Sequence, residues 1–280
     1  MLFIDLALAR RLEAAEGFAS AQFALARRSL FPESTSEAVR IAGADVTFDG
    51  ADSPVTQTFG LGLFEEAAPQ TLGEIEEFFS QRGAPVQHEV CPFAGVATID
   101  LLCARGYRPI EISSVLYRPV DSLPSGNQTH VRTIAPEEAE LWTRVNAIGW
   151  AHDHPEFQDF MQQVGTLLTA REGSACFLAE IDGEPSAAGA LSIHKGVALF
   201  VGASTVPEKR RRGLQSALLE ARMRYAHECG CDLAMMVALP GSDSHRNAQR
   251  QGFQVAYTRI KWRKASVPMA SPGMPDFRAG

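Results

Sequence analysis

The residues best suited to chemistry stand where a predicted strand gives way to a predicted helix in the second half of the chain. Residues 204–218 read STVPEKRRRGLQSAL, so three consecutive arginines directly precede Gly213. The first turn of a helix has backbone N–H groups without intrahelical partners and carries a partial positive charge, which suits a pyrophosphate. A solvated basic turn is the plainer alternative. A glycine at this junction favours the anion site, because it lets an anion approach the backbone.

The elements that must position this passage follow one another in a clear order. Strands are predicted at 176–181, 187–194 and 197–204, and a helix at 214–228 leads to a strand at 233–238. A short helix then ends at Gly252 and a strand covers 255–263, while an amphipathic helix at 142–150 precedes the whole set. Antiparallel strands followed by helix, strand, helix and strand predict an α+β fold.

The first half of the chain repeats the later part of this order. A helix is predicted at 72–81, a strand at 86–90, a helix at 97–104 and a strand at 110–118. Gly83 precedes Gly230 by 147 residues and Gly106 precedes Gly252 by 146, and these nearly equal offsets indicate an internal duplication. A chance match of two αβ layers is the alternative. We therefore expect a domain over 1–120, a linker over 121–128, a second domain over 129–264 and a flexible tail over 265–280.

The second half resembles the GNAT superfamily of N-acetyltransferases. In that family a Gln/Arg-x-x-Gly-x-Gly/Ala motif links the fourth strand to the third helix, and here Arg210 and Gly213 match its first two fixed positions. Gln215 departs from the usual Gly or Ala, which predicts a less open loop. Residues 205–207 (TVP) and Gly252-Phe253 match two further family patterns. The resemblance implies two modules, each with a mixed, mostly antiparallel sheet flanked by helices.

The same resemblance implies acetyl-CoA as acyl donor and direct transfer to an amine in a ternary complex. Backbone groups of residues 203–205 would then pair with the pantetheine and polarise the thioester carbonyl, as an oxyanion hole does. The resemblance and the strand-to-helix junction at Gly213 together predict the cofactor-binding residues. These are Ser204, Thr205, Val206, Arg210, Arg211, Arg212, Gly213, Leu214, Gln215 and Asn247.

The group that protonates the departing thiolate is less evident. The position at which the family carries a tyrosine acid is Ala248 here. Some members use a serine at the start of the same helix, and Ser244 matches that place. Ser244 also suits a helix N-cap, and Asn247, one turn further on, either faces the cofactor or solvent. Both alternatives stay open at this point.

A general base is expected near His152-Asp153-His154, where such folds place the loop that faces the substrate. Either histidine could accept a proton, and Asp153 could hold a cationic amine. A plain polar loop is the alternative, and no third ligand with suitable spacing supports a metal site. Glu180 and His194 lie on predicted strands, and either could face the cleft.

The first half has the same pattern of elements but lacks the basic residues expected to bind the cofactor. Its counterpart of the fourth strand is predicted at 59–64, and Glu65 and Glu66 follow where the second half has arginines. Like charges repel a pyrophosphate, so this half is predicted to be a degenerate module that lost its cofactor site.

Composition narrows the function classes. The 280 residues carry 26 Lys and Arg against 33 Asp and Glu, a net charge of −7, which argues against a nucleic-acid binder. The five cysteines have no framework spacing and are expected to be reduced, buried thiols of a cytoplasmic protein. The amino-terminal residues match neither a signal peptide nor a membrane span.

The sequence thus predicts an acetyl-CoA-dependent N-acetyltransferase that acts on a small-molecule or peptide amine, with no nucleic-acid, membrane or metal partner. Its oligomeric state cannot be read from the sequence. A non-catalytic acetyl-CoA-binding regulatory or sensor module is the alternative, because the usual tyrosine acid is missing.

Overall fold

Eleven strands and seven α-helices are formed by the residues that the computed structural model describes, which are 2–121, 129–151, 155 and 158–265. The strands are β1 (Glu37–Ile41), β2 (Ala44–Phe48), β3 (Gln57–Phe59), β4 (Gln87–Val90), β5 (Tyr107–Pro119), β6 (His130–Thr133), β7 (Ser174–Ile181), β8 (Glu184–His194), β9 (Val197–Thr205), β10 (Leu233–Ala238) and β11 (Gln254–Lys264). The helices are α1 (Leu6–Leu30), α2 (Pro69–Ser80), α3 (Gly95–Ala104), α4 (Ala139–Ala151), α5 (Gln158–Ala170), α6 (Leu214–Glu228) and α7 (Asp243–Arg250).

The two halves of the chain share one sheet and exchange their last strands. The strand order is β1-β2-β3-β4-β11-β5-β10-β9-β8-β7-β6, and only the equivalent pairs β3–β4 and β9–β10 are parallel. The last strand of the first half, β5, pairs with β10 of the second half, while β11 pairs with β4 of the first half. The mostly antiparallel α+β fold predicted from the sequence is confirmed, and each half completes the sheet of the other.

The glycine landmarks of the duplication stand at equivalent places. Gly83 and Gly230 follow α2 and α6, and Gly106 and Gly252 follow α3 and α7. All four have positive φ, between 66° and 81°. Glycine adopts this left-handed conformation at no steric cost, so it suits the residue just beyond a helix end.

Most predicted elements are confirmed, and α6 and β10 have the predicted bounds. The strand predicted at 59–64 is wrong: β3 ends at Phe59, and the following residues form a turn. Gly60 (φ 80°) and Gly62 (φ 73°) take the chain out of the extended conformation. The linker residues 122–128 and the tail residues 266–280 lie outside the described residues, so the domain boundaries stay a prediction.

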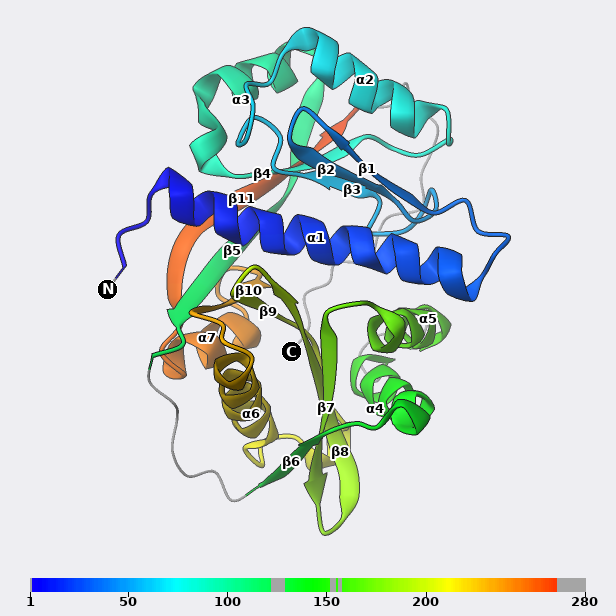
Figure 1. Cartoon of the computed structure of the whole chain (residues 1–280), viewed down its shortest axis with the longest axis vertical. Coiled ribbons are helices and arrows are strands. Elements are labelled where there is room, and N and C mark those ends of the chain that lie inside the picture. Colours follow the sequence, from blue (N-terminus) through cyan, green and yellow to red (C-terminus); the bar gives the residue numbers. More distant parts are fainter. Residues whose placement is uncertain (1, 122–128, 152–154, 156–157, 266–280) are drawn as a thin grey trace.

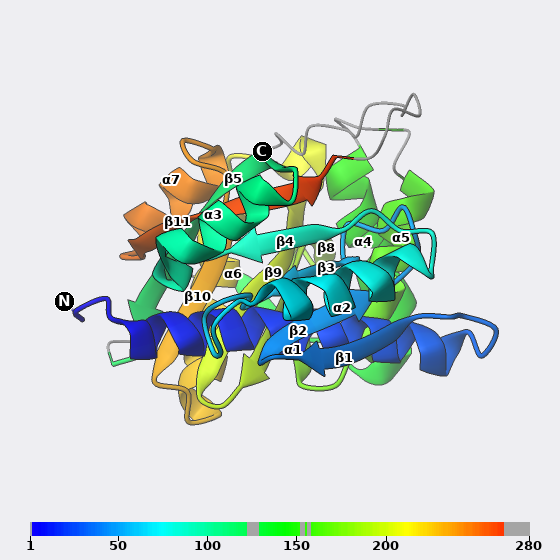
Figure 2. The ribbon, with the colours of Figure 1, turned by 90° about the horizontal axis from the view of Figure 1, so that it is seen from above.

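Helices cover both faces of the sheet (Figures 1 and 2). In the second half, alternate strand residues face opposite sides: Ala198 and Ala234 belong to the core beneath α6 and α7, while Leu199 and Met235 pack against α1. Helices α4 and α5 pack on the α1 side as well. Figure 1 shows α1 running across the middle of the molecule, and it contacts strands of both halves.

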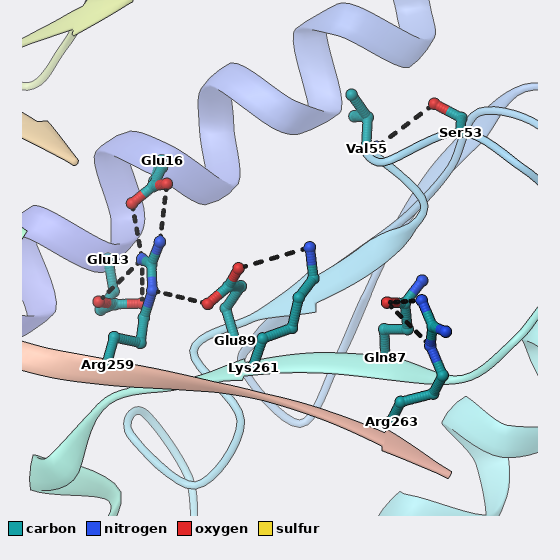
Figure 3. A network of polar contacts seen from close by, with 9 residues as sticks. All are labelled: Glu13, Glu16, Ser53, Val55, Gln87, Glu89, Arg259, Lys261 and Arg263. Atoms are coloured by element: carbon teal, nitrogen blue, oxygen red, sulfur yellow. Dashed lines mark hydrogen bonds and ion pairs between the residues drawn. The ribbon is translucent and has the colours of Figure 1, made fainter. Parts of the chain in front are cut away.

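A buried ion-pair network ties α1 to the exchanged strand β11 (Figure 3). The Arg259 guanidinium, 2% exposed, donates to Glu13 and Glu16 of α1 and, through Nε at 3.0 Å, to Glu89 of β4. The Tyr257 hydroxyl also donates to Glu13 at 2.8 Å. Burial raises the pKa of Glu13 to about 7, against the opposing effect of Arg259. Strands from both halves and α1 thus meet at one arginine.

The five cysteines form no disulfide, but they are not all buried as expected. Cys91, Cys176 and Cys231 are buried, whereas Cys103, in the last turn of α3, and Cys229, the C-cap residue of α6, are exposed. Within the described ranges, no helix combines the length and the apolar character needed to cross a membrane.

Candidate functional site

The parallel strands β9 and β10 separate well before their carboxyl ends. They pair only from Val197 to Leu199 on β9, and beyond that point the two strands diverge. A cavity of about 840 Å³ opens between them, lined by residues 200–205 of β9 and 236–238 of β10. The outer edge of each strand stays paired, β9 to β8 and β10 to β5. Strand backbone facing the cavity can therefore pair with an extended ligand.

The amino-terminal end of α6 opens into this cavity. Gly213 is the N-cap residue, with φ 80°, and a Cβ added there would meet no atom within 4 Å. Leu214 and Gln215, the first residues of the helix, also line the cavity. Their N–H groups precede the first intrahelical bond, which Ala217 N makes to Gly213 O, so they can bind an anion.

Basic side chains surround this helix mouth. Lys209, Arg210 and Arg211 line the cavity, and Arg210 Nη2 donates to Gly149 O of α4 at 3.0 Å. Arg211 has φ 62°, a strained value for a residue with a side chain, of the kind that concentrates at functional sites. The loop therefore presents cationic groups and helix N–H groups to the same space.

Tight packing fixes the end of β9. Gly149 lies so close to it that an added Cβ would come within 2.6 Å of Ser204 Oγ. Gln215 Nε2 donates to Thr205 Oγ1 at 2.8 Å, which joins α6 to the strand. Gly202 has φ 59° at an irregularity in the β8–β9 pairing. The end of β9 is thus held apart from β10 by contacts with α4 and α6.

The structure brings most of the predicted cofactor-binding residues together. Those that line the cavity are Ser204, Thr205, Arg210, Arg211, Gly213, Leu214, Gln215 and Asn247. Val206 is not among the lining residues and donates its N–H to Ser186 O at 2.9 Å. Arg212 lines a separate hollow beside β7 and Glu180, so the three arginines do not act on one space.

The predicted catalytic residues have different outcomes. Ser244 lines the cavity, but the expectation that it caps α7 is wrong: the cap is Ser242, whose Oγ accepts from His245 N at 3.2 Å. The helix begins at Asp243, so Ser244 already lies in its first turn. His152, Asp153 and His154 lie outside the described residues, and their roles stay a prediction.

The two strand residues considered as bases do not line the cavity. Glu180 pairs with Arg132 at 2.8 Å, and the His194 ring stacks on Phe18 with centroids 4.4 Å apart. Across the described part of the chain, no group of three or more His, Cys, Asp or Glu side chains could hold a metal ion.

Several lining residues were not predicted as site residues, among them Glu111 and Ser113 of β5, Trp150 of α4 and Arg222 of α6. Arg222 is 2% exposed and donates to Ala190 O and Val201 O. Burial lowers its pKa to about 9, which leaves it a cation at neutral pH. Local sequence gave no signal for Arg222, since it resembles any basic residue of a surface helix.

The equivalent place in the first half is filled. By the offsets of the preceding glycines, Arg259 is the counterpart of Ser113 and Glu89 that of Met236, two residues that line the cavity. Arg259 of the exchanged strand β11 and Glu89 of β4 form a buried ion pair, and α1 adds the carboxylates of Glu13 and Glu16 (Figure 3). The turn before α2 carries the exposed carboxylates Glu65 and Glu66.

Comparisons with known proteins agree with this architecture. Residues 137–253 match the family described as Acetyltransferase (GNAT) family. A GCN5-related N-acetyltransferase from Kribbella flavida superposes with a TM-score of 0.66 at 18% identity, covering 92% of this chain and 96% of that one. A second, from Sphaerobacter thermophilus, gives a TM-score of 0.54 at 17% identity over 74% and 71% of the two chains.

A tandem GNAT protein from the clavulanic acid biosynthesis pathway is also similar, with a TM-score of 0.54, 15% identity and coverage of 80% and 79%. At such identities the likeness shows the fold alone. No curated protein matches the sequence. The family match begins within η2 (Pro136–Glu138) and extends past α7, so it includes α4, β9, α6, β10 and α7 of the cavity lining but not β5. Residues 137–253 therefore match the GNAT acetyltransferase family, and the chain has the fold of these solved GNAT structures, a tandem GNAT protein among them.

Proposed function

We propose that this protein is an acetyl-CoA-dependent N-acetyltransferase of the cytoplasm, which moves an acyl group to the amine of a small molecule or peptide by direct transfer. The observation that carries the proposal is the cavity between the diverging strands, into which the mouth of α6 opens at Gly213. The free cysteines support the compartment.

The residues present fit the cofactor. The pyrophosphate would lie at Gly213 and Leu214, where open space, helix N–H groups and the side chains of Arg210 and Arg211 meet. The pantetheine would extend along β9, whose edge is unpaired toward β10 beyond Leu199. When bound, acetyl-CoA supplies an activated acetyl group. Arg222 is buried and lines the cavity, and its positive charge would favour the anionic groups of acetyl-CoA.

The chain's own residues would then handle the protons. Ser244 lines the cavity from the first turn of α7, and no cap bond occupies it among the described contacts. We propose that its hydroxyl donates to the departing thiolate sulfur. Asn247, one turn further along the same face, would hold the cofactor.

The test measures acetyl-CoA turnover with a panel of primary amines, using release of the CoA thiol as the readout. Calorimetry measures acetyl-CoA binding in parallel. A transferase binds the cofactor and releases thiol only when an accepted amine is present. Binding without thiol release from any amine would support the non-catalytic sensor, which the buried Ala248 in place of a tyrosine favours. Absence of binding would contradict both functions.

A further inference from the structure

The exchanged strand β5 extends beyond the end of its neighbour β10. Their pairing stops at Ala238 opposite Ser114, while β5 reaches back to Tyr107 and pairs there with β11. Side chains of a strand alternate between its faces, so Glu111 and Ser113 share one face and both line the cavity. The first half of the chain therefore builds one wall of the site in the second half.

Among the described residues, polar atoms without hydrogen-bond partners line this cavity on three elements. Ser113 is 5% exposed and Ser204 is 7% exposed, and neither hydroxyl has a hydrogen-bond partner among the described residues. The indole Nε1 of Trp150 is likewise buried and unpaired within the described part of the chain. These atoms come from β5, β9 and α4. Buried polar groups normally have partners, so these three atoms are available to bind a polar ligand in the cavity.

Basic and acidic side chains line different parts of the cavity. Lys209, Arg210 and Arg211 stand at the mouth of α6, whereas β5 contributes the carboxylate of Glu111. The other acidic lining residue, Asp243, lies on α7 with its side chain 65% exposed. A cavity with cations at one wall and a carboxylate at another is complementary to an anionic cofactor and a cationic acceptor.

We infer that Glu111 and Ser113 form the acceptor subsite, and that the acceptor is a primary amine that is cationic at neutral pH. This inference rests on the proposed function and adds the substrate class and the residues that recognise it. The Glu111 carboxylate pairs with the ammonium group, and the Ser113 hydroxyl accepts a hydrogen bond from the same nitrogen.

The proton balance follows from these positions. The ammonium gives one proton to Glu111, whose exposed position on β5 lets that proton pass to water. The neutral nitrogen forms the new N–C bond as the thioester C–S bond breaks with its electron pair on sulfur. The second proton leaves nitrogen for solvent, and the thiolate takes one from Ser244, which water restores. The products are the amide, free CoA thiol and one proton.

The experiment uses the full chain and three variants: Glu111→Gln, Ser113→Ala and, as a matched control on the exposed surface of α2, Glu74→Gln. The probes are n-butylamine, benzylamine, ethanolamine and a tripeptide with a free amino terminus, with n-butanol as the neutral comparison. Amine binding to the CoA complex is measured by saturation-transfer NMR, acetyl-CoA binding by calorimetry, and turnover by thiol release.

We expect at least one amine, but not n-butanol, to bind the wild-type complex. In Glu111→Gln its KM or dissociation constant should rise about tenfold or more, since a charge-assisted hydrogen bond is lost. Acetyl-CoA affinity should change less than about twofold, and Glu74→Gln should match the wild type. Ser113→Ala should fold at least as stably as the wild type while weakening amine binding.

Unchanged amine binding in both variants would overturn the inference while leaving the transferase in place. Failure of every amine to bind the wild-type complex would overturn it too, whatever the protein does with acetyl-CoA. Loss of acetyl-CoA binding by the wild type would instead reject the proposed function. A fall in acetyl-CoA affinity with unchanged amine binding in Glu111→Gln would assign Glu111 to the cofactor and reject the acceptor subsite.

Discussion

Gln215 Nε2 lies 2.8 Å from Thr205 Oγ1, so the residue that departs from the family motif is hydrogen-bonded to the end of β9. The side chain is turned to the strand, which leaves the backbone N–H at the helix mouth to meet the cofactor. The departure thus replaces an open loop by a bond between α6 and the diverging strand.

Removing the hydrogen bond between Gln215 and Thr205 should lower stability without weakening acetyl-CoA binding. Gln215→Ala restores a residue that the family uses there, and the loss of one hydrogen bond should lower the free energy of unfolding by about 1 kcal/mol. Acetyl-CoA should bind no more weakly than to the wild type. Urea denaturation and calorimetry measure the two quantities. A loss of affinity of about tenfold would show that the Gln215 side chain itself contacts the cofactor.

Substitutions of Ser244 and Ser242 are likewise expected to have different effects, one on turnover and the other on stability. Ser244→Ala should lower turnover much more than it weakens acetyl-CoA binding, with unfolding unchanged, because Ser242 is the residue that caps α7. Ser242→Ala should cost about 1 kcal/mol of stability. Equal turnover per folded molecule in Ser244→Ala would remove this residue from the mechanism.

The network around Arg259 should make stability depend on pH. Burial raises the folded-state pKa of Glu13 to about 7, above its ordinary value of 4.5, so the folded protein holds a proton that the unfolded chain releases. The stabilising contribution of this proton is present below pH 4.5 and is lost as pH rises through 7. Because Glu13→Gln cannot titrate, its unfolding free energy should fall less steeply between these values.

The slope difference between wild type and Glu13→Gln can reach about 1.4 kcal/mol per pH unit. Denaturation at half-unit intervals measures it, and Glu74→Gln is the exposed control. Parallel curves for the wild type and Glu13→Gln would mean that Glu13 is ionised throughout and fully compensated by Arg259.

Local patterns predicted the elements that carry the proposed cofactor site. The bounds of α6 and β10 follow from the glycines beyond the helix and from a continuous apolar strand, and both signals lie close in sequence. The motif around Gly213 likewise placed most of its residues on one cavity. These predictions succeeded because each depends on neighbours within a few residues.

Long-range pairing was not predictable in this way. Nothing near Glu111 indicates that β5 crosses to β10, so its place on the cavity wall follows from the strand exchange alone. Glu13 resembles a surface residue of an alanine-rich helix until Arg259 is seen beside it. The strand predicted at 59–64 failed because the apolar alternation there hides two glycines with positive φ.

The central claim is that one acetyl-CoA binds per chain, in the second half. Arg210 and Arg211 stand at the mouth of α6, whereas the turn before α2 has Glu65 and Glu66 and no basic residue from Ile41 to Gln81. The counterpart of the cavity is filled by Arg259 and its carboxylates. A second cofactor would therefore meet negative charge and packed side chains.

Calorimetric titration of the intact chain with acetyl-CoA tests this most directly, with Gly213→Asp, Arg210→Glu and Glu65→Ala as variants checked for folding by circular dichroism. We predict saturation at one equivalent, loss of binding in Gly213→Asp and Arg210→Glu, and wild-type binding in Glu65→Ala. Two equivalents, or binding that survives in folded Gly213→Asp, would contradict the assignment of the cofactor to the second half.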